Sequence, residues 1–235
     1  MKICIITDER SGSSTFTECF RCVNLKVIHD PQTRSKMKFN RDFKSIKEMM
    51  NFSFLNADVV KICYFSFSID KYREILNYCI EYNIHMIFLH RENIYKRALS
   101  KCTASNLKYY SKFDKTKKNK PFNIKIKDYK KYLINYNNHI KEHICYLNEK
   151  KQPYYFITYE EVFTNKQLIR DLFKSLGLNI QIESNLEKLL NQDYNTHEKN
   201  KLILNLKQIE NIDKNFPKPI FDLTYKIKKI GRAHV

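Results

Sequence analysis

Long apolar runs are missing from this sequence of 235 residues. No stretch approaches the roughly 18 consecutive apolar residues that a transmembrane helix needs, so we expect no membrane span. The N-terminus, where Met1 and Lys2 precede the short apolar run Ile3–Ile6, becomes polar too soon for a secretory signal. Acidic residues are also few: 25 Asp and Glu stand against 43 Lys and Arg, a formal charge of +18. That excess predicts an anionic ligand.

The seven cysteines are odd in number and irregularly spaced, which argues against a disulfide framework. Cys4, Cys63 and Cys79 lie inside apolar stretches, as buried free thiols do. Cys19 and Cys22 form a lone C-x-x-C without a second pair at zinc-site spacing, so we expect no zinc there. The sequence therefore favours a reducing compartment, and we expect a cytoplasmic protein.

Length and composition predict one domain over residues 1–229. With 43% apolar and 14% aromatic residues, a chain of this length can bury a substantial core. The last six residues, 230–235 (IGRAHV), resemble the in-frame translation of a sequencing adapter. We therefore expect them to be a non-native tail and the native C-terminus to be missing.

Alternating strand and helix patterns predict a three-layer α/β/α domain with a central parallel sheet, because strand–helix–strand units of this length pair their strands in parallel. The expected strands are Ile3–Ile6, Asp58–Phe65, Ile84–Leu89 and Tyr154–Thr158. Helices are expected over Ser14 to about Leu25, Ile69–Tyr82, Asn93 to about Tyr110, Ile124–Lys150 and from Thr158 through Leu176, with Glu183–Asn215 helical or irregular. Ser111–Pro121 is expected to be a basic, solvated loop that includes Lys115 to Lys120.

Glycine is scarce, so each position that uses it is informative. Of the three glycines, Gly231 lies in the tail and Gly177 follows a helical pattern, where it predicts a helix C-cap. Gly12 stands between the first strand and the first helix, which Ser13 or Ser14 is expected to cap. Backbone N–H groups, hydroxyls and one arginine make this turn a candidate anion site, formed by Arg10, Ser11, Gly12, Ser13, Ser14 and Thr15. It lacks the second glycine and the lysine of the nucleoside-triphosphatase P-loop, G-x-x-x-x-G-K-[ST].

Two segments resemble motifs of sulfotransferases that use 3′-phosphoadenosine 5′-phosphosulfate (PAPS), above all the nodulation-type and carbohydrate branches. The sequence Arg10–Ser14 (RSGSS) is similar to the loop that binds the 5′-phosphosulfate in that family. The segment after the third expected strand, with Arg91 and Ser100 nine residues apart, resembles the family's 3′-phosphate motif. His90, Arg91 and Arg97 are all candidates for the basic group that meets this phosphate.

The resemblance implies a P-loop NTPase-like sulfotransferase fold, PAPS as donor, a hydroxyl acceptor on a saccharide or glycolipid, and no metal. It also implies a catalytic base after the first helix, where Asp30 and His29 are the two candidates, although Asp30 fits a capping residue before the Pro31 turn equally well. Lys61 is expected either to touch the sulfuryl group or to pair with a carboxylate. Tyr159 and Glu160 resemble the family's Y-E-D-L segment, in which we expect a structural role.

Other classes of protein predict different features. Residues His139–His143 (HIKEH) spell the H-x-x-E-H pattern of a zinc metallopeptidase, but that class leaves the motifs at Arg10 and Arg91 unexplained. A nucleic-acid-binding protein would follow from the charge alone, and because lysine-rich composition is spread over the whole chain we expect no nucleic-acid partner. A kinase-like enzyme would need the missing P-loop lysine and a Mg²⁺ carboxylate.

Overall fold

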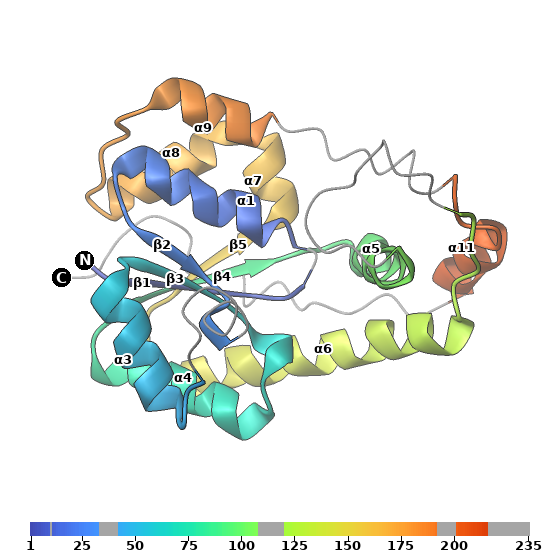
Figure 1. Cartoon of the computed structure of the whole chain (residues 1–235), viewed down its shortest axis with the longest axis horizontal. Helices are drawn as coiled ribbons and strands as arrows, with labels where there is room; N and C mark the ends of the chain where they lie inside the picture. Colours follow the sequence, from blue (N-terminus) through green and yellow to red (C-terminus); the bar gives the residue numbers. More distant parts are fainter. Residues whose placement is uncertain (10, 33–41, 108–119, 192–200, 216–235) are drawn as a thin grey trace. The chain divides into compact units, whose positions relative to one another are not determined.

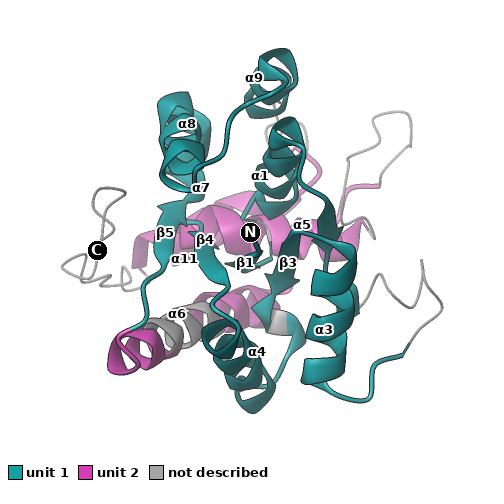
Figure 2. Cartoon of the chain, turned by 90° about the vertical axis from the view of Figure 1, so that its left-hand side faces the viewer, with its two compact units in different colours: residues 1–92, 152–192, 223–235 teal, residues 93–151, 193–222 magenta. Residues whose placement is uncertain are grey.

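The computed structural model describes residues 1–9, 11–32, 42–107, 120–191 and 201–215, apart from the side chains of 65, 135–141, 143 and 144 (Figure 1). The chain divides into two compact units, which Figure 2 colours separately. The first takes in Met1–Glu92 and Gln152–Gln192, and the second takes in Asn93–Lys151 with the described part of Asp193–Asp222. The single domain over residues 1–229 stays a prediction.

In the described part of the chain, five strands form one sheet, and all of it belongs to the first unit. The strands lie in the order β2-β3-β1-β4-β5, and each adjacent pair runs parallel. This confirms an α/β fold with a central parallel sheet. The strand bounds are β1 Ile3–Thr7, β2 Val27–His29, β3 Val59–Cys63, β4 His85–His90 and β5 Tyr155–Thr158.

The strands at the middle of the sheet are buried on both faces. Every residue of β1 and β3 is buried, which explains why these strands read as continuous apolar runs rather than alternating ones. Figures 1 and 2 show helices of the first unit on both sides of the sheet, with α1, α7, α8 and α9 on one side and α3 and α4 on the other. Their bounds are α1 Ser13–Glu18, α3 Ile46–Asn56, α4 Ile69–Glu81, α7 Tyr159–Thr164, α8 Lys166–Ser175 and α9 Glu183–Leu190.

Aromatic rings fill the core on the α1 side of the sheet. Phe16 and Phe20 meet edge to face at 5.6 Å, and Phe20 meets Phe173 of α8 at 5.0 Å. All three are at most 1% exposed. On the side of α4, Tyr72 and Ile75 are buried to the same extent, so apolar burial stabilises both layers against the sheet.

The first helix begins differently from the expectation. Gly12 is its N-cap, and no side chain among the described residues caps it, so the prediction of a Ser13 or Ser14 cap is wrong. Gly12 has φ of +71°, a conformation that costs least for glycine. The helix ends at Glu18, and a 3₁₀ segment, η1 (Cys19–Val23), continues it.

Two other boundaries depend on capping. The helix predicted through Leu176 divides into α7 and α8 at Asn165. Thr158 begins α7 with a capping box, in which its side chain accepts from the Glu161 N–H and the Glu161 carboxylate accepts from the Thr158 N–H. After α8, Gly177 has φ of +68°, and Leu178 N donates to Phe173 O at 2.8 Å, which confirms the predicted glycine at the helix C-terminus.

The described part of the second unit contains the helices α5 Ile94–Asn106, α6 Ile126–Glu149 and α11 Leu206–Asn215. The Tyr129 hydroxyl donates to Asp213 Oδ1 at 2.5 Å and joins α6 to α11. The Asn205 side chain both accepts from Ile124 N and donates to Ile124 O, each at 2.9 Å. The helices predicted at Asn93 to about Tyr110 and, from apolar periodicity, at Ile124–Lys150 are confirmed as α5 and α6.

None of the helices within the described ranges has the length and apolar character needed to cross a membrane. The tail 230–235 lies outside the described residues, as does most of the predicted basic loop.

Candidate functional site

The sheet topology points to one edge as the place for a ligand. From β1 the chain goes to β2, which lies at one edge of the sheet beyond β3. From β4 it goes to β5, which lies at the opposite edge. In open parallel sheets, ligands bind outside the carboxyl ends of strands where the connections diverge in this way. Thr7 and Leu89 pair in register, so the segments that follow β1 and β4 leave the sheet beside each other.

Hydroxyl groups hold the segment after β1 in a tight turn. The Ser11 hydroxyl donates to Asp8 O at 2.9 Å and lies 2.5 Å from the Thr7 hydroxyl. Both side chains are buried, at 0% and 1% exposure. Ser11 therefore stabilises the turn through its side chain, while Arg10 lies outside the described residues.

The end of this turn packs closely against α7. A Cβ built on Gly12 would lie 2.5 Å from Cδ2 and Cε2 of Tyr159 and 3.0 Å from Cε2 of Phe163. Only glycine fits both this spacing and the positive φ. Beyond it, Ser13 and Thr15 are buried and Ser14 is exposed.

Arg91 follows β4 and is held by residues of α7. Its guanidinium carbon lies 4.7 Å from the centre of the Tyr159 ring, a cation–π distance. Its Nε lies 4.0 Å from Oε1 of Glu160, and Oε2 of Glu160 accepts from the Glu92 N–H at 3.0 Å. Tyr159 thus contacts both Gly12 and Arg91, the two segments that the sequence singled out.

The other candidates for the 3′-phosphate site are the last residue of β4 and two residues of the second unit. His90 ends β4 with 5% exposure, and its ring lies 5.8 Å from that of Phe156. Arg97 and Ser100 belong to α5, in the second unit. Arg97 is 3% exposed and donates through Nη2 to Tyr132 O at 3.1 Å, so part of its guanidinium fastens α5 to α6.

A second polar cluster lies at the carboxyl ends of β2 and β3. Lys61 Nζ is 2.6 Å from Asp30 Oδ2, with side-chain exposures of 6% and 17%. Asp30 has φ of +44°, donates from its N–H to Lys61 O at 2.8 Å and accepts from Cys63 N at 3.1 Å. Burial raises the pKa of the Cys63 thiol at the end of β3, and the charges of Glu9, Asp30 and Asp8 raise it further, whereas that of Lys61 lowers it.

His29 faces the α1 layer instead of the sheet edge. Its Nε2 lies 2.5 Å from Glu18 Oε1 at the end of α1, and its side chain is 7% exposed. Arg21 donates to the other oxygen of Glu18 at 2.7 Å. Burial alone would raise the pKa of Glu18, but the hydrogen bonds and charges of His29 and Arg21 outweigh it and lower that pKa.

Among the described residues no three His, Cys, Asp or Glu side chains are grouped as a metal site would need. Cys19 and Cys22 are buried free thiols, and burial raises the pKa of Cys19 to about 12, which disfavours the thiolate that binds zinc. The side chains of His139 and His143, the histidines of the H-x-x-E-H pattern, lie outside the described residues.

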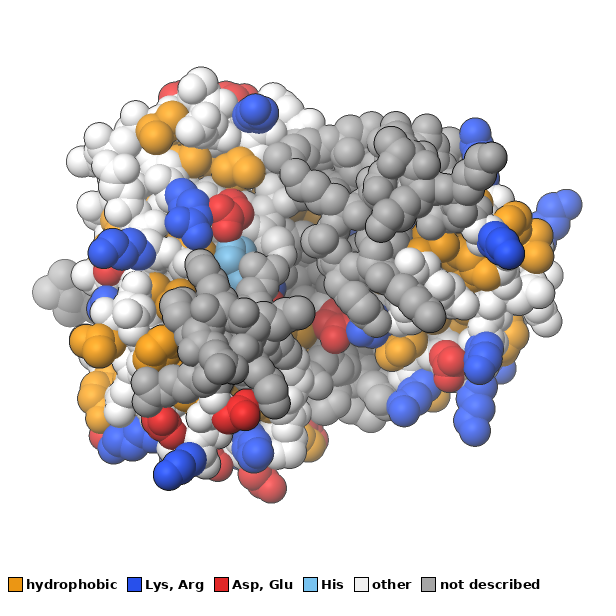
Figure 3. All heavy atoms as spheres, viewed as in Figure 1, with side chains coloured by type: hydrophobic (Ala, Val, Ile, Leu, Met, Phe, Trp, Pro, Cys, Tyr) orange, Lys and Arg blue, Asp and Glu red, His pale blue; other side chains and the backbone are white. Residues whose placement is uncertain are grey.

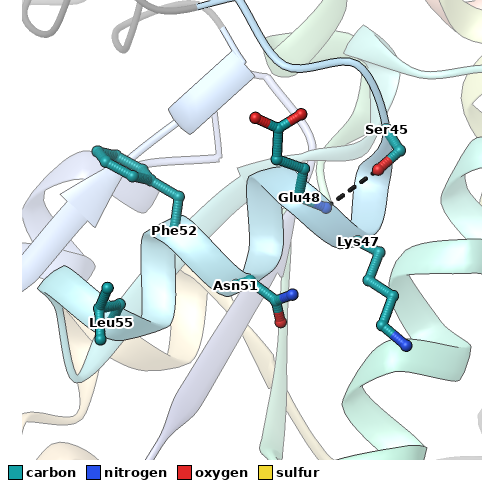
Figure 4. Close-up of a pocket in the computed structure, with 6 residues that line it drawn as sticks. All are labelled: Ser45, Lys47, Glu48, Asn51, Phe52 and Leu55. Carbon is teal, nitrogen blue, oxygen red and sulfur yellow. Dashed lines mark hydrogen bonds between the residues drawn. The ribbon is translucent and has the colours of Figure 1, made fainter.

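The described surface shows two further features. A shallow pocket is lined by Ser45, Lys47, Glu48, Asn51, Phe52 and Leu55, which all belong to α3 or its N-cap (Figure 4). One helix and its cap line this pocket, and none of the residues expected at the site lies in it. On the face drawn in Figure 3, the described Lys and Arg side chains lie among acidic and apolar ones.

No model of a known protein family matches this sequence, and no curated protein matches it either.

Proposed function

We propose that this chain is a sulfotransferase that moves the sulfuryl group of PAPS to a hydroxyl of a saccharide or glycolipid. One observation carries the proposal: the turn at Gly12 and the arginine at position 91 follow neighbouring parallel strands, and Tyr159 contacts both. These are the segments whose sequences resemble the two donor-binding motifs of that family. Their meeting at the edge where open sheets bind ligands supports one site for a doubly anionic nucleotide.

Each donor group has a matching segment in this proposal. The backbone of Ser11–Thr15 binds the 5′-phosphosulfate, where Gly12 allows close approach, and Arg10 neutralises its charge. Arg91 binds the 3′-phosphate, and the role predicted for Ser100, which belongs to the second unit, stays a prediction. The buried free thiols fit a reducing compartment such as the cytoplasm.

Asp30 is the proposed base, with Lys61 beside it. The acceptor oxygen forms a bond to sulfur while the bond from sulfur to the 5′-phosphate oxygen breaks, and the acceptor proton passes to the Asp30 carboxylate. We assign to the Lys61 ammonium, 2.6 Å from that carboxylate, the stabilisation of negative charge on the sulfuryl oxygens. His29 is the alternative base, but its contact with Glu18 turns Nε2 toward α1, which favours Asp30.

Binding of the product nucleotide, 3′-phosphoadenosine 5′-phosphate (PAP), tests the proposal. We expect isothermal titration to show micromolar binding of PAP by the full chain, much weaker binding of AMP, loss of PAP binding in Arg10→Ala, and PAP binding reduced to the level of AMP in Arg91→Ala. Absence of PAP binding by folded wild-type protein would overturn the proposed function.

A further inference from the structure

Register places Arg91 and Tyr159 next to each other as they leave the sheet. His90, the last residue of β4, pairs with Thr158, the last residue of β5. Arg91 directly follows His90, and Tyr159 directly follows Thr158. The capping box at Thr158 then fixes the first turn of α7, and with it the Tyr159 backbone.

The ring of Tyr159 is held by its neighbours. Its centre lies 4.6 Å from that of Phe163, one turn further along α7. The Gly12 backbone approaches so closely that a Cβ there would overlap Tyr159, which limits how far the ring can move toward the turn. Arg91 lies over this ring, with 11% of its side chain exposed.

A nucleotide with phosphates at its 5′ and 3′ positions fixes the distance between its two anionic groups. The protein must hold its two binding segments at a matching spacing, and one rigid side chain in contact with both can do so. We infer that Tyr159 is a positioning residue that holds Arg91 at the correct spacing from the Gly12 turn, and so gives the site its preference for a 3′-phosphate. This inference rests on the proposed function.

Titration with PAP and AMP separates this role from a structural one. AMP carries the 5′-phosphate alone, so loosening of the Gly12 turn weakens both nucleotides, whereas misplacing Arg91 weakens PAP only. We expect Tyr159→Leu to lower the ratio of PAP to AMP affinity by about 3- to 30-fold, the range of a cation–π contact. Tyr159→Phe, which keeps the ring, should retain the ratio.

Two controls complete the experiment. Val162→Ala removes a fully buried side chain of α7 without touching the ring, and should lower stability while leaving the ratio unchanged. In an Arg91→Ala background, Tyr159→Leu should change the ratio no further, because the two residues act as one unit. If Tyr159→Leu fails to unfold cooperatively, Tyr159→Met replaces it.

The outcomes are distinct. The inference is overturned if the wild-type protein prefers PAP and the Tyr159→Leu variant either keeps that preference or loses affinity for both nucleotides equally. The proposed function then still stands. A wild-type protein without any preference for PAP overturns both.

Discussion

The buried Lys61 and the partly exposed Asp30 form an ion pair, 2.6 Å from Nζ to Oδ2, that joins β3 to the residue after β2. Removal of one partner leaves the other charge uncompensated. We expect Lys61→Met to lower the free energy of unfolding by about 3–5 kcal/mol. The double variant Lys61→Met/Asp30→Asn should recover a large part of this loss, because an asparagine tolerates the positive φ and still accepts from Cys63 N. Urea unfolding measures the free energy of unfolding of both variants, and equal losses in the single and the double variant would contradict the pairing.

Asp30→Asn also tests the proposed base. The amide cannot take the acceptor proton, so we expect transfer to fall by about 10²–10⁴-fold with PAP affinity unchanged. PAP release from PAPS in the presence of a panel of mono- and oligosaccharides measures this. His29→Asn is the matched variant, and greater loss of transfer in it than in Asp30→Asn would assign the role of base to His29.

Gly12→Ala should damage both stability and donor binding. The added Cβ would overlap the Tyr159 ring, and the alanine would have an unfavourable positive φ, at a combined cost of about 2–4 kcal/mol. Gly177→Ala is the matched control, because Gly177 has a similar φ but nothing within 4 Å of a Cβ. Thermal unfolding compares them, and a loss no larger for Gly12→Ala than for Gly177→Ala would show that Tyr159 yields easily.

The contact between Glu18 and His29 predicts a pH dependence of stability. The folded-state pKa of Glu18 is lowered, so its contribution is present above the ordinary glutamate pKa of about 4.3 and is lost as pH falls through the lower value. Glu18→Gln should cost about 1 kcal/mol near pH 6, since solvent screens this partly exposed carboxylate, and less below pH 4. Glu74→Gln, on the exposed surface of α4, should show no such change.

Asp213 in the second unit predicts the opposite trend. Burial raises its pKa, although the hydrogen bond from Tyr129 opposes the rise. The stability that depends on protonated Asp213 is therefore present below about pH 4 and is lost as pH rises through the higher folded value. Asp213→Asn keeps an acceptor for the Tyr129 hydroxyl and should be more stable than wild type at pH 7 but not at pH 4. Urea unfolding at both pH values checks this, and a constant difference between them would contradict it.

Local patterns were sufficient for most of the first unit. Apolar runs predicted β1, β3, β4 and β5 to within a few residues, because central parallel strands are buried on both faces. The short strand β2 was missed, since its three residues, VIH, lie at the edge of the sheet and carry no distinct pattern. Helix α3 was also missed, and its apolar residues are divided between a buried face and exposed Leu55.

The candidate site was predicted in part. The scarcity of glycine drew attention to Gly12, and the basic residues after the third expected strand drew attention to Arg91. The expected structural role of Tyr159 and Glu160 did not include contact with either segment. A Tyr-Glu pair at the start of a helix directly after a strand could have indicated this contact, because such a pair lies at the sheet edge where the strands end.

The sequence by itself determined that the chain folds as an α/β domain with a parallel sheet and a glycine turn after its first strand, because burial patterns and backbone geometry are local properties. Only the tertiary structure decided which distant residues meet there. Strand order brought β4 beside β1, register aligned His90 with Thr158, and packing placed Tyr159 against Gly12. It likewise joined Asp30 to Lys61 and turned His29 toward Glu18, because such pairings depend on which strands are neighbours and on the face each side chain occupies.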